Sequence, residues 1–194
     1  MGKIYCVMGK SSSGKDTVYK KLKEQYKEFR LIVSYTTRPI REGEKDGVEY
    51  YFVSEDRFCE MKESKKVIEA RSYNTKCGIW TYFTADDGQI DLNASDYLLI
   101  GTLVSYRALR KYFGESYIVP IYLEVEDGLR LVRALERERR QDEPKYAEMC
   151  RRFLADEEDF SEENLIKSGI TERFCNEDLA ACLDKIRTYI GKNR

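Results

Sequence analysis

Short apolar runs alternate with amphipathic segments along most of this chain. Residues 4–8 (IYCVM) and 97–100 (YLLI) are fully apolar and end at turn residues, which predicts buried strands. In segment 16–28, apolar residues recur every fourth position among lysines and glutamates, which is the spacing of one helix face. The same patterns predict further strands at 31–35, 50–53, 67–70, 79–84, 117–123 and 170–175, and further helices at 55–65, 103–113, 127–142, 145–159 and 179–190.

This alternation of strands and helices predicts an α/β fold with a mainly parallel sheet covered by helices on both faces. Residues 36–84 are richer in strand and loop signals, with turn residues at Pro39, Gly43 and Gly47, which predicts a small inserted β-rich subdomain. A length of 194 residues fits one domain with such an insertion.

The overall charge and composition exclude several classes of function. With 34 basic and 35 acidic residues the chain lacks the basic excess of a nucleic-acid or membrane-surface protein, so we expect neither partner. Its apolar runs are far shorter than the ~20 residues of a transmembrane helix. The chain contains no histidine, which removes histidine metal sites, Ser-His-Asp triads and histidine general bases.

Six cysteines stand at irregular spacings without a C-x-x-C pair. The first residues (MGKIYCVMGK) lack the long apolar stretch of a secretion signal. We therefore expect reduced thiols and a cytoplasmic location.

A phosphate-binding motif follows the first predicted strand. Residues 9–17 read GKSSSGKDT, so that Gly9, Gly14 and Lys15 have the G-x-x-x-x-G-K spacing of a P-loop between a strand and a helix. The glycines let several backbone N–H groups point at one anion, the helix start adds positive potential, and the lysine reaches the β- and γ-phosphates. The predicted ATP-binding residues of this loop are Gly9, Ser11, Ser12, Ser13, Gly14, Lys15, Asp16 and Thr17.

Asp16 stands where a P-loop usually has the serine or threonine that binds Mg²⁺. A carboxylate is also a good ligand for this hard cation, so Asp16, with help from Thr17, is the predicted metal ligand. The alternative is an acidic residue favoured in the first turn of a helix by the helix dipole.

A second anion site is predicted just after the strand at 31–35. Arg38 and Arg41 form a fork suited to a phosphate monoester, and the Tyr50 hydroxyl can add a third donor. Solvated arginine pairs are common, so spacing alone leaves both interpretations open.

The segment T-T-R-P-x-R-x-G-E-x-D-G-x-x-Y-x-F-V-S resembles the acceptor-phosphate segment of guanylate kinases, and the P-loop lies some thirty residues upstream. The resemblance is clear over roughly residues 3–70 and weaker beyond. It implies a three-layer P-loop NTPase core with a parallel sheet, an acceptor-binding subdomain and a helical lid. It also implies Mg²⁺-dependent transfer of phosphate from ATP to GMP. The implied division is a core of 1–35, 85–125 and 146–194, an acceptor-binding subdomain of 36–84 and a lid of 126–145.

The resemblance also assigns roles to individual residues. It implies that Ser34, Arg38, Arg41 and Tyr50 hold the GMP phosphate and that Glu69 reads the guanine edge, where two adjacent N–H donors suit a carboxylate. The other residues that it places at GMP are Gly78 and Thr102. The arginines that it places at the ATP phosphates are Arg133, Arg137, Arg140 and Arg152. Lys15, Arg38, Arg137 and Arg152 are the expected catalytic residues. Spacing alone would make the lid arginines a solvated helix face.

Two departures from the family pattern bear on base specificity. The usual Tyr-Gly-Ser/Thr step is nearest to Cys77-Gly78-Ile79, which lacks both hydroxyls. The candidates to replace them are Tyr73, Thr75, Trp80, Thr81 and Tyr82. An acidic strand end in the family corresponds here to Gly101-Thr102, without a carboxylate.

Two alternatives remain beside a GMP kinase. One is a kinase of another phosphorylated acceptor, such as a different nucleotide or a ribose phosphate, since GKD[ST] loops resemble one in a kinase of ribose bisphosphate. The other is a non-catalytic guanylate-kinase-like binding module, in which the P-loop lysine tends to be lost. The sequence makes no prediction of oligomeric state.

Overall fold

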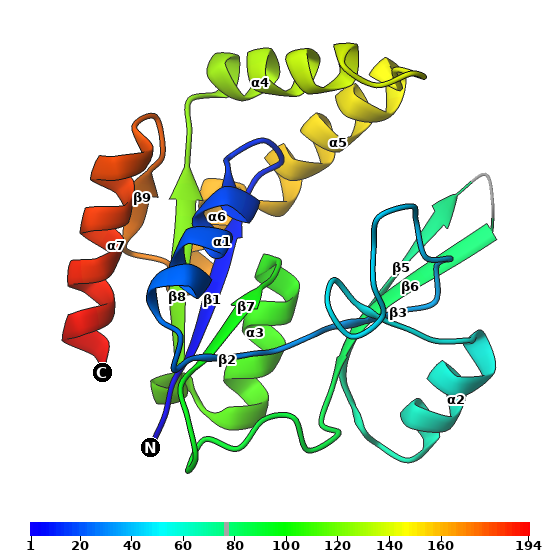
Figure 1. Ribbon diagram of the computed structural model, residues 1–194, viewed down its shortest axis with the longest axis vertical. Coiled ribbons are helices and arrows are strands. Elements are labelled where there is room, and N and C mark those ends of the chain that lie inside the picture. The colour runs from blue at the N-terminus through cyan, green and yellow to red at the C-terminus, as the bar shows by residue number, and fades with distance from the viewer. Residues whose placement is uncertain (76–77) are drawn as a thin grey trace.

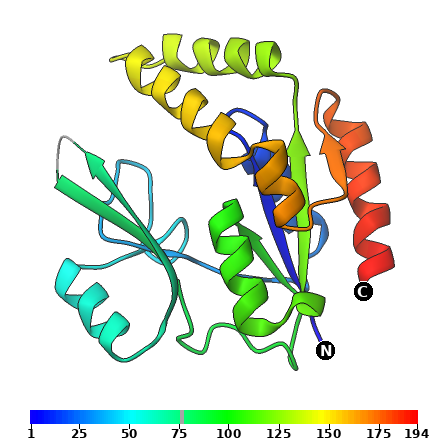
Figure 2. The same ribbon diagram turned by 180° about the vertical axis from the view of Figure 1, so that it is seen from behind.

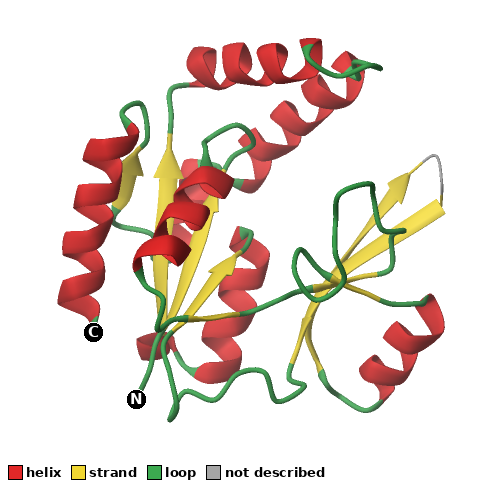
Figure 3. Ribbon diagram, in the orientation of Figure 1, coloured by secondary structure: helices red, strands yellow, loops and turns green. Residues whose placement is uncertain are grey.

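A computed structural model describes residues 1–75 and 78–194 of the chain. Its core is a five-stranded parallel sheet in the order β2-β7-β1-β8-β9 (Figures 1 and 3). The strands are β1 (Ile4–Gly9), β2 (Arg30–Leu31), β7 (Tyr97–Ile100), β8 (Ile118–Glu124) and β9 (Arg173–Cys175). The central strand β1 is fully apolar because both of its faces are buried.

Helices cover both faces of this sheet, as predicted. On one face, Tyr5 and Val7 of β1 pack in a cluster with α1 (Lys15–Gln25) and α7 (Leu179–Asn193). On the other face, Cys6 and Met8 pack in a cluster that includes residues of α3 (Leu103–Phe113) and α6 (Glu162–Lys167) (Figure 2). A short 3₁₀ turn, η1 (Glu115–Tyr117), leads from α3 into β8.

A smaller mixed sheet, in the order β4-β3-β6-β5, forms the subdomain predicted between residues 36 and 84. Its strands are β3 (Tyr35–Thr36), β4 (Tyr51–Phe52), β5 (Val67–Thr75) and β6 (Gly78–Ala85). The helix α2 (Glu55–Glu63) packs on this sheet through Met61, which shares a separate hydrophobic cluster with Phe83 and Ala85. The predicted fold class is therefore confirmed.

A pair of helices projects from the carboxyl end of the large sheet. α4 (Asp127–Arg139) leads away from the core and α5 (Tyr146–Asp159) returns to it (Figure 1). Within the described residues, no helix combines the length and apolar character needed to cross a membrane.

The observed elements differ from those predicted from the sequence in three places. The single strand predicted at 31–35 is wrong, because β2 ends at Leu31 in the large sheet and β3 begins at Tyr35 in the small one. The chain crosses between the two sheets here, so one end of the run pairs with β7 in the large sheet and the other end pairs with β6 in the small one. The helix α6 was not predicted, and β5 extends five residues beyond the predicted end at 70.

Candidate active site

The loop between β1 and α1 has the geometry that its sequence predicts. After Gly9 the chain turns back, with the Ser13 N–H donating to the Lys10 carbonyl at 3.2 Å. Gly14 takes a left-handed conformation (φ 82°) directly before α1. A Cβ there would lie 2.4 Å from the Nδ2 of Asn176, which donates to the Ser13 carbonyl at 2.8 Å. Gly14 is therefore required both by its backbone angle and by the close approach of Asn176.

The loop also contains buried polar atoms that suit an anion. The hydroxyls of Ser12 and Ser13 are buried and have no hydrogen-bond partner among the described residues. Buried hydroxyls in native proteins nearly always have a partner. Together with the amino-terminal end of α1, these donors fit a bound phosphate group.

Lys15 opens α1 and lies in a field of other charges. Burial lowers its pKa, and the nearby guanidinium groups of Arg152 and Arg137 lower it further, while the carboxylates of Asp16 and Asp156 oppose the shift. Arg152 also donates from Nη2 to the Ser11 hydroxyl at 3.2 Å. The structure thus brings Arg137 of the predicted lid and Arg152 of α5 to the P-loop.

Arg133 of α4 and Arg140, which directly follows α4, are placed differently. Arg133 donates from Nη2 to the carbonyl of Asn176 at 3.1 Å, so it lies against the loop that follows β9. Arg140 is exposed at the carboxyl end of α4, at the far end of the projecting pair of helices (Figure 1).

An ion-pair network that the sequence did not predict ties α4 and α5 to the P-loop. Arg130, which is only 1% exposed, donates to Asp127 at 2.7 Å and to Glu157 at 2.5 Å, and its Nη1 donates to the Ser11 carbonyl at 3.2 Å. Lys10 contacts the same Glu157 carboxylate at 2.7 Å. The arginine-rich sequence gave no signal that Arg130, rather than its neighbours, would be buried.

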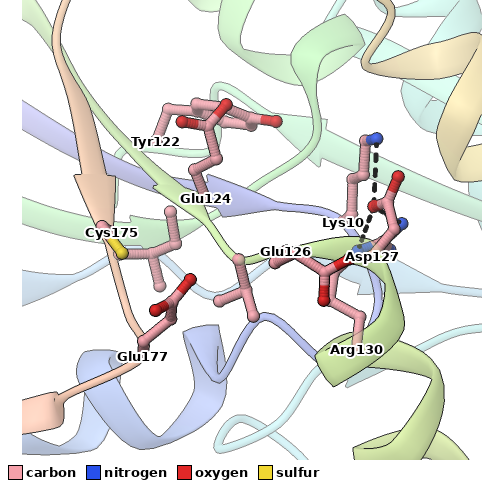
Figure 4. Close-up of a pocket in the computed structure, with 10 residues that line it drawn as sticks. Lys10, Tyr122, Glu124, Glu126, Asp127, Arg130, Cys175 and Glu177 are labelled. Atoms are coloured by element: carbon pink, nitrogen blue, oxygen red, sulfur yellow. Dashed lines mark hydrogen bonds and ion pairs between the residues drawn. The ribbon is translucent and has the colours of Figure 1, made fainter.

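A cavity of about 450 Å³ opens beside this network, at the carboxyl ends of β8 and β9 (Figure 4). Lys10, Asp127 and Arg130 stand on one side of it, and Glu124, Cys175 and Glu177 stand on the other (Figure 4).

Across from the P-loop, Arg38 is held rigidly in the small subdomain. Its side chain is 3% exposed and lies over the rings of Tyr50 and Phe52, with 5.2 Å to each centroid. Its two terminal nitrogens donate to Glu44 at 2.7 and 2.5 Å. This hydrogen bonding lowers the pKa of Glu44 to about 2, so the carboxylate fixes the guanidinium throughout the physiological range.

The other residues predicted at the acceptor phosphate lie around Arg38. Burial raises the pKa of Tyr50, and Tyr82 adds to the rise, whereas the charges of Arg38 and Arg71 oppose it. The carboxylate of Asp16 on α1 also raises it, so Tyr50 is within electrostatic reach of both predicted anion sites. Arg41 is exposed and donates its backbone N–H to Glu44 at 2.8 Å, and Ser34 is partly buried, its carbonyl accepting from the Tyr51 N–H at 2.9 Å.

Glu69 lies on β5 with a side chain that is only 4% exposed. Its Oε1 accepts from the Thr84 hydroxyl at 2.9 Å, and its Oε2 accepts from the Nε of Arg71 at 3.1 Å. Arg71 in turn donates from Nη1 to the hydroxyl of Thr102, which caps α3, at 2.8 Å. Glu69 and Thr102, predicted separately from the sequence, are therefore linked through an arginine that the sequence did not single out.

Gly78 does not join this group. It begins β6 at the tip of the β5–β6 hairpin, next to Cys77, which lies outside the described residues. Glu69 pairs with Thr84, so Gly78 is six residues, or about 20 Å, further along the strand.

The residues of β6 that lie opposite Glu69 and Arg71 are Thr84 and Tyr82. Tyr82 and Thr84 have a Tyr-x-Thr spacing that begins five residues after the Cys77 position. We call the surface formed by Glu69, Arg71, Tyr82 and Thr84 the acceptor face.

The predicted metal ligands Asp16 and Thr17 are exposed in the first turn of α1. Among the described residues, no group of three or more acidic or cysteine side chains could enclose a metal ion by itself. A single carboxylate at the phosphate loop fits a Mg²⁺ ion that a nucleotide brings with most of its ligands supplied by phosphate and water.

Comparison with known proteins gives a consistent result. The family model described as guanylate kinase matches residues 1–79. The guanylate kinase of Symbiobacterium thermophilum is 28% identical over 192 residues, which cover 97% of this chain and 84% of that protein. The guanylate kinase of Legionella pneumophila (strain Lens) is 43% identical over 74 residues, which cover 38% of this chain and only 35% of the relative.

Structural similarity extends over nearly the whole chain. The crystal structure of guanylate kinase from Anaplasma phagocytophilum superimposes with a TM-score of 0.68, covering 98% of this chain and 85% of the other at 19% identity. At that identity the similarity establishes the shared fold.

Proposed function

Because the chain belongs to the guanylate kinase family of phosphotransferases, we propose that it transfers the γ-phosphate of ATP to GMP, giving ADP and GDP. One observation supports this most directly. The chain combines two candidate anion sites: a P-loop with the unpartnered buried hydroxyls of Ser12 and Ser13, and Arg38 of the small subdomain, which Glu44 holds and which lies over the Tyr50 ring. A donor phosphate and an acceptor phosphate in these sites are positioned for transfer between them.

On the donor side, the P-loop amides and Lys15 bind the β- and γ-phosphates of ATP. Arg137 and Arg152, whose charges act on Lys15, neutralise the negative charge of the phosphoryl group during its transfer. The unpartnered hydroxyls of Ser12 and Ser13 donate to the same phosphates. Arg133 and Arg140 are the further arginines that we assign to this lid.

On the acceptor side, Arg38 and Tyr50 orient the attacking phosphate oxygen, together with Arg41 and Ser34. The acceptor phosphate is largely dianionic at pH 7, since its second pKa is about 6. It needs no general base, which fits a chain without histidine. The ring of Tyr82, one of the candidates to replace the missing hydroxyls, lies 5.6 Å from that of Tyr50 between centroids, so we add Tyr82 to the phosphate-binding residues.

Asp16, with Thr17, is the residue that would hold Mg²⁺ at the donor phosphates. The ion, when bound, supplies charge neutralisation at the β- and γ-phosphate oxygens. The described cysteines are free thiols, and we place the reaction in the cytoplasm, where thiols stay reduced.

A coupled ADP-release assay with MgATP and a panel of acceptors tests this function. The panel contains GMP, dGMP, AMP, CMP, UMP and ribose phosphates. Turnover with GMP far above the others is the expected result. Activity on another acceptor alone would keep the donor site and overturn the GMP assignment, and the absence of turnover and of ATP binding would indicate a binding module.

A further inference from the structure

The acceptor face contains a guanidinium beside its buried carboxylate. Glu69 and Arg71 are two residues apart on β5, so both side chains point to the same side of the sheet. The Glu69 side chain is 4% exposed, whereas that of Arg71 is 19% exposed. Arg71 therefore keeps part of its surface open to whatever binds on this face.

The hydrogen bonds on this face fix which atoms are free to meet a ligand. Among the described residues, Arg71 donates from Nε to Glu69 and from Nη1 to Thr102, so further N–H groups on its terminal nitrogens have no partner there. Thr84 is only 1% exposed, and its hydroxyl donates to Glu69 Oε1, so Thr84 fixes the carboxylate. Each Glu69 oxygen accepts one bond in these contacts and has capacity for another.

Arg71 and Glu69 thus present a donor beside an acceptor. The edge of guanine offers the complementary pair, the carbonyl oxygen at C6 and the N1–H. Adenine instead has an amino donor at C6 and a lone pair at N1. The donor Arg71 would then meet a donor, and the acceptor Glu69 would meet an acceptor. Hydrogen bonding from arginine to guanine, which includes the C6 carbonyl oxygen, is also the commonest specific base contact in DNA recognition.

We propose that Arg71 is a specificity-determining residue that donates to the C6 carbonyl oxygen of the acceptor base, while Glu69 accepts from N1–H. The inference rests on the proposed function and names the group that selects the base. Arg71 pairs with Tyr82 across the hairpin, and the Tyr82 ring lies 5.6 Å from that of Tyr50 between centroids, so the acceptor face continues toward the phosphate end of the acceptor site.

The competing interpretation is that Arg71 only compensates the buried Glu69 charge. An acceptor that differs at a single atom separates the two. In 6-thioguanosine monophosphate the carbonyl oxygen is replaced by sulfur, a weaker acceptor, and N1–H and the amino group are retained. IMP keeps the carbonyl and lacks only the amino group, so it serves as the control acceptor.

The experiment measures kcat/KM for GMP, 6-thio-GMP and IMP in the wild type and in Arg71→Met. A charged hydrogen bond predicts a wild-type preference for GMP over 6-thio-GMP of roughly ten- to a hundredfold. In Arg71→Met this preference should fall close to one, while the ratio of GMP to IMP stays unchanged. Equal losses of kcat/KM for GMP and 6-thio-GMP in Arg71→Met would overturn the proposal and leave Arg71 as a support for Glu69.

Two further variants control for folding. Arg57→Met removes an exposed arginine of the same subdomain, paired with Glu60 on α2, and should alter no ratio. Arg71→Lys retains the positive charge beside Glu69 and should retain part of the preference for the oxygen. If Arg71→Met does not fold, an Arg71→Lys variant with the full wild-type preference would overturn the proposal.

Calorimetric binding of GMP and 6-thio-GMP without ATP separates failure of base recognition from failure of transfer. If the protein binds GMP more tightly than 6-thio-GMP but shows no turnover, the proposed function would be overturned and the role of Arg71 supported. Turnover with a preference for AMP would overturn the role of Arg71 and leave phosphoryl transfer standing. If no nucleotide binds, both are overturned.

Discussion

At the scale of single residues, Lys15 is in a less favourable environment than an exposed lysine. Burial and two nearby guanidinium groups lower its pKa, so the folded protein holds an ammonium whose charge is only partly compensated. A bound triphosphate supplies the missing negative charge. The free energy of nucleotide binding therefore includes relief of this electrostatic strain.

Removal of this charge should abolish transfer without affecting the acceptor site. In Lys15→Ala we expect kcat to fall by at least about a hundred- to a thousandfold, the usual effect of losing one group that stabilises a transition state. The Kd for GMP, measured by calorimetry, should be unchanged. Lys20→Ala, on the exposed side of α1, is the matched control. Near-normal turnover of Lys15→Ala would show that the donor site has been assigned wrongly.

The lowered pKa of Lys15 also predicts a pH dependence. Only the protonated amine attracts phosphate, so ATP binding is constant below the pKa of the free enzyme and weakens above it. Since burial lowers that pKa from 10.5, kcat/KM for ATP should decline at a lower pH than an ordinary lysine would produce. The pKa values of Arg38 and Tyr50 are raised, so the Kd for GMP, measured without ATP, should stay flat over the same range. A parallel weakening of GMP binding would contradict this assignment.

At the scale of elements, α4 and α5 are joined to the P-loop by charge as well as by packing. Arg130 is nearly inaccessible, while its partners Asp127 and Glu157 are 48% and 37% exposed. Asp156, next to Glu157 on α5, accepts from the Ser11 N–H at 2.7 Å. The network thus fixes the first half of the loop from the side of the lid.

Weakening this network should destabilise the fold. In Glu157→Gln, Arg130 and Lys10 lose a shared carboxylate, and we expect the free energy of unfolding in urea to fall by roughly 1–3 kcal/mol. Glu163→Gln is the control, because its pair with Lys167 is 75% and 63% exposed and should contribute less than about 1 kcal/mol. Equal effects of the two substitutions would mean that the network does not stabilise the loop.

The loop before β4 orients the acceptor arginine through Glu44. In Glu44→Gln we expect a rise in KM for GMP of about tenfold, since Arg38 loses its charged partner. Glu42→Gln, an exposed neighbour, should have no effect. The pKa of Glu44 is lowered to about 2 in the folded state, so the pair stabilises the fold above the ordinary glutamate value and this stability is lost as pH falls toward 2. The difference in stability between wild type and Glu44→Gln should shrink over that acidic range.

At the scale of the whole molecule, the acceptor subdomain has its own hydrophobic cluster around Met61, Phe83 and Ala85. The chain connects it to the core at two places, before β3 and after β6. Separate cores allow the two parts to move relative to each other. Without nucleotide, the positive charges of Lys15, Arg137 and Arg152 repel one another, and bound phosphate removes this repulsion between the P-loop and helices α4 and α5.

Binding of both substrates should therefore make the molecule more compact. A non-hydrolysable ATP analogue with GMP is expected to reduce the radius of gyration in small-angle X-ray scattering, more than either ligand alone. In Lys15→Ala the change on adding both ligands should be small. Identical scattering with and without ligands in the wild type would contradict closure driven by these charges.

The sequence by itself determined the parts of the molecule that depend on local order. The P-loop is a strand, a turn and a helix in succession, so the spacing of Gly9, Gly14 and Lys15 predicts its conformation. The strand at 97–100 and the helix at 103–113 were also predicted at their observed bounds, because period and burial agree within each segment.

The tertiary structure decided everything that depends on which strands pair and in what register. The run 31–35 contributes to two sheets, a division that no local pattern records. Hairpin register places Tyr82 and Thr84, rather than the neighbours of Cys77, on the acceptor face. Arg71 meets Thr102 across 31 residues of sequence, and Arg130 meets Ser11 across 119. Such contacts arise from long-range packing, whose free energy is shared among many side chains, so no single segment of the sequence encodes them.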